Sequence, residues 1–355
     1  MPGAADRANY EGISAEWLNE HGAEAAARFT EQGLLRINGL VDAMTCHALR
    51  LHVDGCLVEA RAAAGEGADS PDVFGDVHAG EHRWDMYLAL EAPVLLMLRE
   101  ATTKLFPALV ELISDEMQVC ELSSLISDSG SARQPLHSDT TWQVGLPPLI
   151  TCFIALQDIK SDMGPTIMVP RTHNDATAHE RLSGKLEMPA REAALGAMHG
   201  TNATAAGLKL AVMQCTINEG DCVMMDSRLF HCGGSNTSSH RRRLAYFSLH
   251  APGILPGDPD HPYSMLPRYK GNLRLHQPRP MRSLDPARLK LFAEYSQKQQ
   301  LKQQRRQEAS NAVQAAPNLG GGDNLKASAK KRKASKSLVA PCSAVYVTYA
   351  EDCDL

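Results

Sequence analysis

Two histidines and one aspartate lie in segments that could bring them to a single metal ion. His137 and Asp139 are two residues apart, and His231 follows much later in the chain. Two imidazoles and one carboxylate can occupy one face of an octahedral iron ion and leave the remaining positions open. The arginine run at 241–243 could supply a guanidinium that holds a dicarboxylate cosubstrate. These residue types favour an oxygen-activating enzyme.

The His-x-Asp pattern occurs three times, at 52–54, 137–139 and 173–175, so its context has to decide. Residues i and i+2 share a face on a strand but point to nearly opposite sides of a helix. The first copy falls in a predicted helix, and the third follows a turn at 170–172. The copy at 137–139 suits a strand that enters a barrel, and it is therefore the predicted metal-binding pair.

The second half of the site follows a predicted strand at 222–226. His231 lies beyond that strand, and the next strand carries Arg241, Arg242 and Arg243. Because side chains alternate between the faces of a strand, either Arg242 points inward or its two neighbours do.

The elements that must position these residues change in character near residue 117. Before it, helices are predicted from Ser14, over 24–32, from Asp42 to Val58 and over 93–113, with a short strand at 34–37 and a Gly- and Ala-rich loop at 62–82. After it, short strands are predicted at 122–127, 149–158, 166–169, 208–217, 222–226 and 244–249, which indicates an antiparallel sandwich or barrel. Residues 218–221 suit a tight turn, and 171–207 are expected to be an insertion near the barrel mouth, with a helical patch at 190–198.

Length and composition are those of a globular protein with one large domain. The chain has 355 residues, of which 43% are hydrophobic and 22% charged. Nine scattered cysteines without a CxxC pair argue against a disulfide framework and favour a reducing compartment. No apolar run reaches the length of a membrane span, and the first residues lack the features of a secretory signal. We expect no membrane partner and a cytoplasmic location.

The charge is unevenly distributed. Residues 282–336 contain thirteen Lys or Arg against four Asp or Glu, which gives this segment a charge of +9. Because the net charge of the chain is −5, the rest of the chain carries −14. We predict one folded domain at 1–280 that contains the candidate metal site, an exposed helix at 281–308, a disordered basic segment at 309–340 and a short tail at 341–355. The run Lys330-Lys331-Arg332-Lys333 resembles a nuclear import signal, which would allow a nuclear location.

An ordered series of motifs over roughly residues 28–250 resembles the phytanoyl-CoA dioxygenase (PhyH-like) family of Fe(II)/2-oxoglutarate-dependent oxygenases. The series comprises FTEQGLL at 29–35, HSD at 137–139, LITCFIALQD at 149–158, MGPTIMVPRTH at 163–173, Gly220-Asp221 and DSRLFH at 226–231. Family members usually have NGPT and PGSH, where this chain has Met163 and Arg171. The resemblance implies a mainly β fold with flanking helices, built on a double-stranded β-helix (jelly-roll, cupin-like) core.

Residue by residue, the resemblance implies that His137, Asp139 and His231 bind Fe(II). It also implies that Arg242, eleven residues after the distal histidine, binds 2-oxoglutarate, with Thr151 and Phe153 nearby. The expected reaction consumes O2 and releases succinate and CO2, with ascorbate as a supporting reductant. Related halogenases replace the carboxylate ligand with a small residue, so Asp139 favours hydroxylation or a similar oxidation. The residues expected to line the substrate pocket are Trp142, Gln143, Arg133, Arg171 and His173.

The substrate is expected to be a small molecule, and two other functions compete with this hydroxylase. A catalytically silent jelly-roll could serve as a binding or scaffold protein. A nuclear oxygenase could act on chromatin or nucleic acid, although no aromatic residues interleave with the basic run.

Overall fold

The structure is a computed structural model. It describes residues 11–64, 73–75, 80–140, 148–183, 203–205, 208–210, 212–251, 264–275 and 345–347. The predicted segments at 281–308 and 309–340, the import-like run and the helical patch at 190–198 lie outside these residues, so the domain boundaries remain predictions. No helix in the described part of the chain is long and apolar enough to cross a membrane.

The N-terminal third is mainly helical, as predicted. After the two-residue strand β1 (Ile13–Ser14) come α2 (Ala15–Glu20), α3 (Gly22–Gln32), β2 (Leu34–Asn38), α4 (Ala43–Ala64) and α5 (Ala92–Leu112). The Ser14 hydroxyl caps α2 by accepting a hydrogen bond from the Trp17 amide at 3.1 Å. Gly33 ends α3 in the left-handed conformation with φ 76°, which lets the chain turn directly into β2.

The large sheet supplies the main wall of a barrel. Its core consists of β2, β11 (Cys222–Asp226), β6 (Ile150–Ala155), β13 (Arg242–His250) and β5 (Met117–Ser127), in that spatial order. All neighbours in this part pair antiparallel. The strand β4 (Arg83–Tyr87) pairs with the other edge of β5 and carries β3 (Phe74–Gly75) beyond it.

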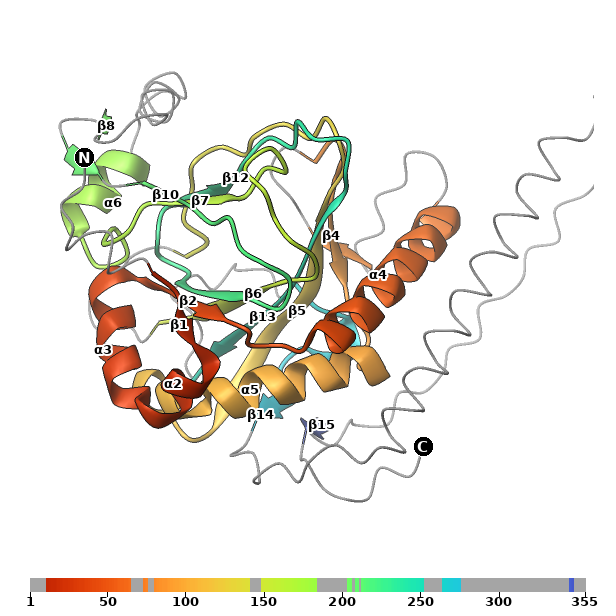
Figure 1. Ribbon diagram of the computed structural model, residues 1–355, viewed down its shortest axis with the longest axis horizontal. Coiled ribbons are helices and arrows are strands. Elements are labelled where there is room, and N and C mark those ends of the chain that lie inside the picture. The colour runs from red at the N-terminus through yellow and green to blue at the C-terminus, as the bar shows by residue number, and fades with distance from the viewer. Residues whose placement is uncertain are drawn as a thin grey trace, which may run out of the picture.

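A small sheet faces the large one and closes the barrel. It consists of β10 (Met213–Gln214), β7 (Thr166–Met168) and β12 (His231–Gly233). Figure 1 shows these three strands on one side of the large sheet and the helices α4 and α5 on the other. Two facing antiparallel sheets with helices on the outer face confirm the jelly-roll prediction.

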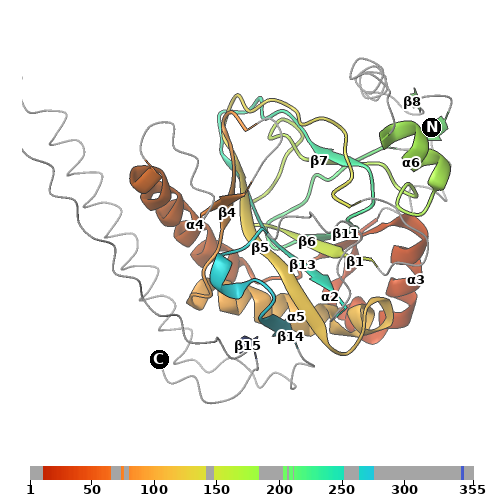
Figure 2. The same cartoon turned by 180° about the vertical axis from the view of Figure 1, so that it is seen from behind.

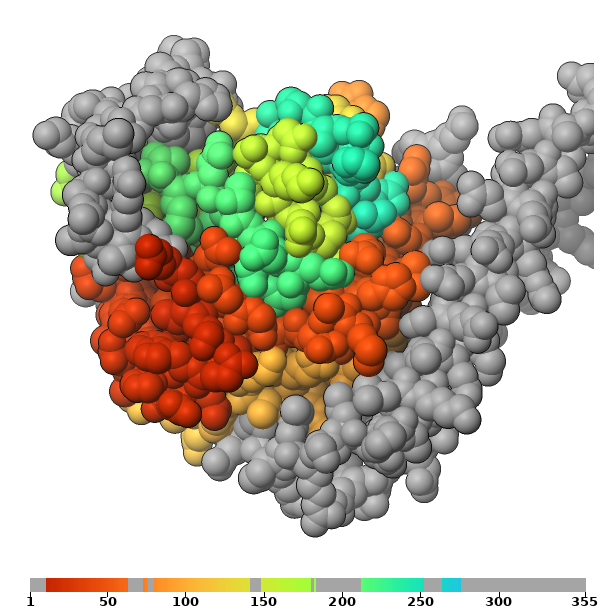
Figure 3. Space-filling view, in the orientation of Figure 1, coloured from red at the N-terminus to blue at the C-terminus, as the bar shows by residue number. Residues whose placement is uncertain are grey.

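Alternation along the strands separates two hydrophobic cores. Outward residues such as Ile154, Met224 and Phe247 join the helices in one large buried cluster. Inward residues such as Phe153, Met225 and Tyr246 form a second cluster with the small sheet, inside the barrel. In the space-filling view, the segments that follow β6 and precede β13 pack side by side over the barrel (yellow-green and teal in Figure 3). An antiparallel bridge between Met163 and Asn236 joins these two segments.

The predicted strands are mostly confirmed, with three differences. The predicted strand at 208–217 is split into β9 (Leu208–Leu210), which pairs with β8 (Ala203–Ala205), and β10. The described part of the insertion contains the helix α6 (Ala176–Ser183). Two strands were not predicted: β15 (Val345–Val347) pairs parallel with β14 (Leu273–Leu275), which lies beside β5; Figure 2 shows this edge.

Candidate metal centre and cosubstrate pocket

His137, Asp139 and His231 come together as the sequence predicted. The Nε2 atoms of both histidines lie 3.6 Å from the same oxygen of Asp139, Oδ1. The two imidazole rings are 4.5 Å apart between centroids. One ligand atom from each residue lies within 4.8 Å of the others, so the group could hold a metal ion. It is the only group of three or more metal-ligating side chains found among the described residues.

Backbone carbonyls fix the orientation of both rings. The Nδ1 atom of His137 donates to the carbonyl of Pro135 at 2.7 Å, and that of His231 donates to the carbonyl of Leu229 at 2.9 Å. A proton on Nδ1 leaves Nε2, the atom that faces Asp139, as the basic nitrogen. This is the arrangement in which histidine usually binds a metal.

The pair at 137–139 is not part of a regular strand, contrary to the prediction. A single antiparallel bridge joins His137 to His231, with backbone hydrogen bonds of 3.0 and 2.8 Å. Asp139 is held instead by its amide, which donates to the carbonyl of Ser227 just after β11 at 2.8 Å. The strand segment β12 and the end of β11 therefore position the carboxylate, where a regular strand had been expected.

The three arginines at 241–243 point alternately outward and inward, in one of the two arrangements that strand alternation allowed. Arg242 points into the barrel and has 0% exposure, whereas Arg241 and Arg243 point outward to acidic partners. The guanidinium of Arg242 donates to the carbonyl of Gly164 and to the hydroxyl of Ser127. Its Nε has no hydrogen-bond partner.

A second buried arginine, Arg83 on β4, was not predicted as a site residue from the sequence. In strand register Arg83 and Arg242 both pair with Ser127, one from each side of β5. Arg83 is 2% exposed, and its Nη2 donates to the carbonyls of Ala132 and Gly234 at 2.9 and 3.0 Å. Its Nε and Nη1 have no hydrogen-bond partner.

These two guanidinium groups suit a buried anion. Neither has an acidic partner within ion-pair distance among the described residues, and three of their nitrogens lack a hydrogen-bond acceptor. Burial lowers the pKa of Arg83 to about 10, and burial together with the charge of Arg83 lowers the pKa of Arg242 to about 9. A carboxylate between them would supply both the missing acceptors and the missing charge. The residues present therefore fit a dicarboxylate that reaches from the metal group into the barrel.

Thr151 and Phe153 lie on the inner face of β6, but they contact different neighbours. The ring of Phe153 lies 5.6 Å from that of Tyr246 on β13. The hydroxyl of Thr151 lies 2.9 Å from that of Ser248, which in turn donates to the carboxylate of Glu121. Thr151 thus belongs to a buried polar group on the wall of the barrel.

The same wall holds a buried carboxyl group, Asp85. The Tyr246 hydroxyl lies 2.9 Å from each of its oxygens. Burial raises the pKa of Asp85 from 3.8 to about 7; the hydrogen bond from Tyr246 opposes this shift, and the charge of Glu121 adds to it. A folded-state pKa above the unfolded value means that the folded protein binds this proton more tightly, so folding stability is lost as the pH rises from about 4 to about 7.

Replacing Asp85 with asparagine should therefore change how stability depends on pH. The variant has no proton to lose, so it should gain about 2–3 kcal/mol relative to wild type between pH 5 and pH 8, at about 1.4 kcal/mol per unit of pKa shift. Urea unfolding of both proteins at the two pH values measures this difference. Parallel pH dependence of the two proteins would contradict a raised pKa at Asp85.

Two of the predicted substrate residues, His173 and Arg171, contact α3. His173 is buried against α3 and donates from Nε2 to the carbonyl of Thr30 at 2.9 Å, beside Gly33. Arg171 is exposed and pairs with Glu31 on α3 at 3.0 Å. These contacts fasten the segment after β7 to α3, and a substrate role for either residue stays a prediction. Arg133 is half-buried in the segment that leads to His137, and Trp142 and Gln143 lie outside the described residues.

The comparisons with known proteins agree with this geometry. Residues 29–244 match the family model described as phytanoyl-CoA dioxygenase (PhyH). The match spans more than half of the chain, and the protein belongs to this family. It is therefore an oxygenase-type enzyme of the Fe(II)/2-oxoglutarate class, and the His137-Asp139-His231 group could hold the metal ion of such an enzyme.

Similar solved structures include AviO1 from Streptomyces viridochromogenes, at 20% identity and a TM-score of 0.46 over 67% of this chain and 98% of that chain. The carbocyclase SnoK of nogalamycin biosynthesis has 19% identity and a TM-score of 0.46 over 70% and 95%. HygX from Streptomyces hygroscopicus, solved with nickel, 2-oxoglutarate and hygromycin B, has 16% identity and a TM-score of 0.45 over 65% and 87%. The search of curated proteins finds no match.

Proposed function

We propose that this protein is a dioxygenase that hydroxylates, or otherwise oxidises, a small molecule with release of succinate and CO2. His137, Asp139 and His231 bind the iron, and Arg242 together with Arg83 binds the distal carboxylate of 2-oxoglutarate. The observation that carries the proposal is the pairing of the His-Asp-His group with two buried arginines that lack an anion.

The contacts between the metal group and the buried arginines support one continuous pocket. β12 begins at His231 and ends at Gly233, and the carbonyl of the next residue, Gly234, accepts a hydrogen bond from Arg83. A Cβ atom at position 233 would lie 2.6 Å from Nη1 of Arg83, so glycine lets this guanidinium approach the strand. Residues 231–234 thus connect one predicted metal ligand to Arg83.

Each residue has a defined task when the cofactors are bound. When bound, iron and 2-oxoglutarate would supply the activation of dioxygen that the oxidation of a substrate needs. The guanidinium groups orient 2-oxoglutarate through charge and hydrogen bonds inside a site from which the barrel walls exclude water. Asp139 completes the ligand set with a carboxylate, which favours hydroxylation over halogenation because it occupies the position that a halide would need.

Purified protein should bind 2-oxoglutarate without oxygen and form succinate once oxygen is admitted. Calorimetry under anaerobic conditions with Fe(II) measures the first step, and mass spectrometry of succinate, with ascorbate present, measures the second. A library of small metabolites, scored by stimulated succinate release, then identifies the substrate class. Absence of both 2-oxoglutarate binding and succinate formation would refute the proposal.

A further inference from the structure

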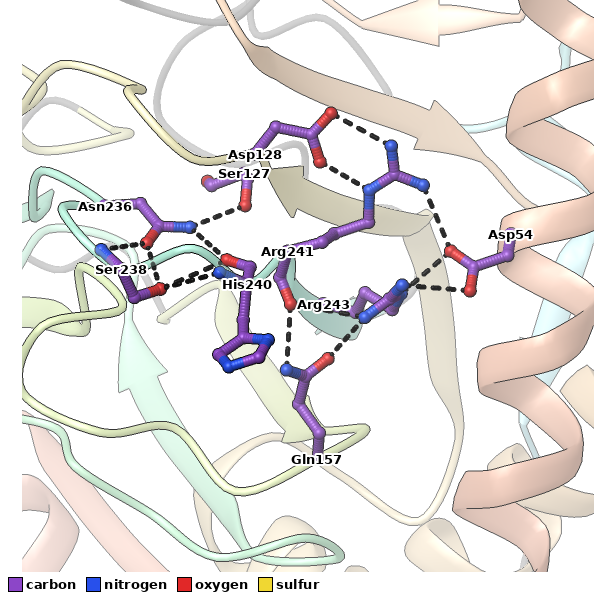
Figure 4. Close-up of polar contacts among 9 residues, drawn as sticks. All are labelled: Asp54, Ser127, Asp128, Gln157, Asn236, Ser238, His240, Arg241 and Arg243. Carbon is purple, nitrogen blue, oxygen red and sulfur yellow. Dashed lines mark hydrogen bonds and ion pairs between the residues drawn. The ribbon is translucent and has the colours of Figure 1, made fainter.

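The two arginines beside Arg242 form an outward-facing network, which we call the arginine clamp. It consists of Arg241, Arg243, Asp54, Asp128 and Gln157. Figure 4 shows both guanidinium groups directed toward Asp54, with Gln157 below them. These residues come from the start of β13, the middle of α4 and the ends of β5 and β6.

Arg243 is anchored to the helix. Its Nε and Nη2 donate to the two oxygens of Asp54 at 2.8 and 3.0 Å, a bidentate pair. Its Nη1 donates to the side-chain oxygen of Gln157 at 2.8 Å. A planar guanidinium held at three nitrogens has little freedom to rotate, so the side chain fixes the outer face of β13 against α4.

Arg241 is anchored to the neighbouring strand. Its Nε and Nη2 donate to the carboxylate of Asp128, directly after β5, and its Nη1 donates to Asp54 at 3.2 Å. The hydrogen bonds that Arg241 donates to Asp128 raise the pKa of Arg241. The backbone of Arg241 is held as well, because its carbonyl accepts from the amide of Gln157 at 2.8 Å.

The clamp therefore fixes the two residues that flank Arg242, through ion pairs of their side chains. Arg242 is the first residue of β13, where a strand end would otherwise fray, and the loop before it is braced by Asn236, whose amide donates to the carbonyls of Ser127 and His240 at 3.0 and 2.8 Å. Asp54 is the shared partner of both outward arginines. A small displacement of a positioning group is enough to weaken ligand binding markedly.

We propose that the clamp, through Asp54, positions the guanidinium of Arg242 for the carboxylate of 2-oxoglutarate. This inference rests on the proposed function, since it assigns Arg242 to that ligand. Asp54, Arg241 and Arg243 touch neither ligand nor metal; they act through the backbone of β13. The clamp couples the outer helix layer to the cosubstrate pocket.

The test compares Asp54→Asn with Glu219→Gln. Glu219 pairs at 2.8 Å with Arg50, which lies on α4 like Asp54, and the two carboxylates are exposed to a similar extent, 28% for Glu219 and 25% for Asp54. The Glu219–Arg50 pair does not include a residue of β13. Asp54→Asn should raise the dissociation constant and the KM for 2-oxoglutarate roughly tenfold, as loss of a supporting partner typically does. The kcat at saturating 2-oxoglutarate and the affinity for Fe(II) should stay unchanged, and Asp54→Glu should restore part of the loss. Glu219→Gln should change none of these values.

Binding is measured by anaerobic calorimetry, with Gln157→Leu as a second variant that loosens the clamp without removing a charge. Equal affinity for 2-oxoglutarate in wild type, Asp54→Asn and Gln157→Leu would overturn the positioning role while leaving the proposed function intact. Failure of wild-type protein to bind 2-oxoglutarate would overturn the proposed function and, with it, this inference.

Discussion

Replacing Asp139 with alanine should abolish succinate formation and weaken Fe(II) binding by more than about 100-fold, since even partners one step further from a metal contribute 10–100-fold. The carboxylate is the only acidic member of the metal group, and both histidine Nε2 atoms lie 3.6 Å from one of its oxygens. Removing it leaves two neutral imidazoles, which bind Fe(II) weakly. Equilibrium dialysis of the metal and mass spectrometry of succinate give the two readouts.

Two controls separate this effect from general disruption. Ser138 stands between the ligands in the sequence, and Ser138→Ala should leave iron affinity unchanged. Asp175 belongs to one of the other His-x-Asp copies and accepts hydrogen bonds from the amides of Thr177 and Ala178 at the start of α6. Asp175→Ala should cost about 1 kcal/mol of stability through loss of this cap, without any change in iron binding. Iron-dependent succinate formation by Asp139→Ala would show that the ligand set is wrong.

Strand alternation left two possibilities for the inward-facing side chains of the arginine run: Arg242 alone or its two neighbours. The family motif then selected Arg242. The structure then showed what the two outer arginines bind: Asp54 on α4 accepts from both, and Asp128 accepts from Arg241. Asp54 belongs to the first His-x-Asp copy, which lies in a helix as predicted, and its carboxylate binds the two outer arginines. Local periodicity can predict which way a side chain points, but a partner 187 residues away in sequence cannot be deduced from it.

Arg83 was missed for a physical reason. It follows a Gly- and Ala-rich segment predicted as a loop, and β4 is only five residues long, so no hydrophobic alternation marks it as an inward position. Its place opposite Ser127 arises from pairing with β5, a long-range contact. A lone arginine at the edge of a predicted loop is usually solvated, and only the tertiary fold buries it.

The contacts of His173 and Arg171 with α3 could not be predicted, for a related reason. The motif at 163–173 predicted residues near the pocket, and β7 does lie beside His231 in register. Immediately after β7 the chain turns toward α3, where the amide of Arg171 donates to the carbonyl of Gln32 at 2.8 Å. The direction of a loop after a strand depends on what it packs against, and α3 lies more than a hundred residues earlier in the chain.

Removing the two buried arginines separately should have unequal and non-additive effects on 2-oxoglutarate affinity. Arg242→Met should weaken binding by about 100-fold, because a buried charge-assisted contact is worth 2–5 kcal/mol, and Arg83→Met by about tenfold. The double variant should bind only slightly more weakly than Arg242→Met. Two groups that hold one carboxylate depend on each other, which a double-mutant cycle detects as a coupling energy of about 1 kcal/mol or more.

The melting temperature of the ligand-free protein provides an independent test of the role of Arg83 and Arg242. Burial lowers the pKa of each guanidinium, so we expect the charged form of each to be disfavoured when no anion is bound. Both single variants should therefore melt no lower than wild type in the absence of 2-oxoglutarate, yet lose most of the rise in Tm that the ligand produces. Arg50→Met, which removes a half-buried arginine paired with Glu219, should lower the Tm without changing that rise. Full additivity of the two affinity losses, with an undiminished ligand-induced Tm shift in Arg83→Met, would place Arg83 outside the pocket and leave Arg242 alone to hold the anion.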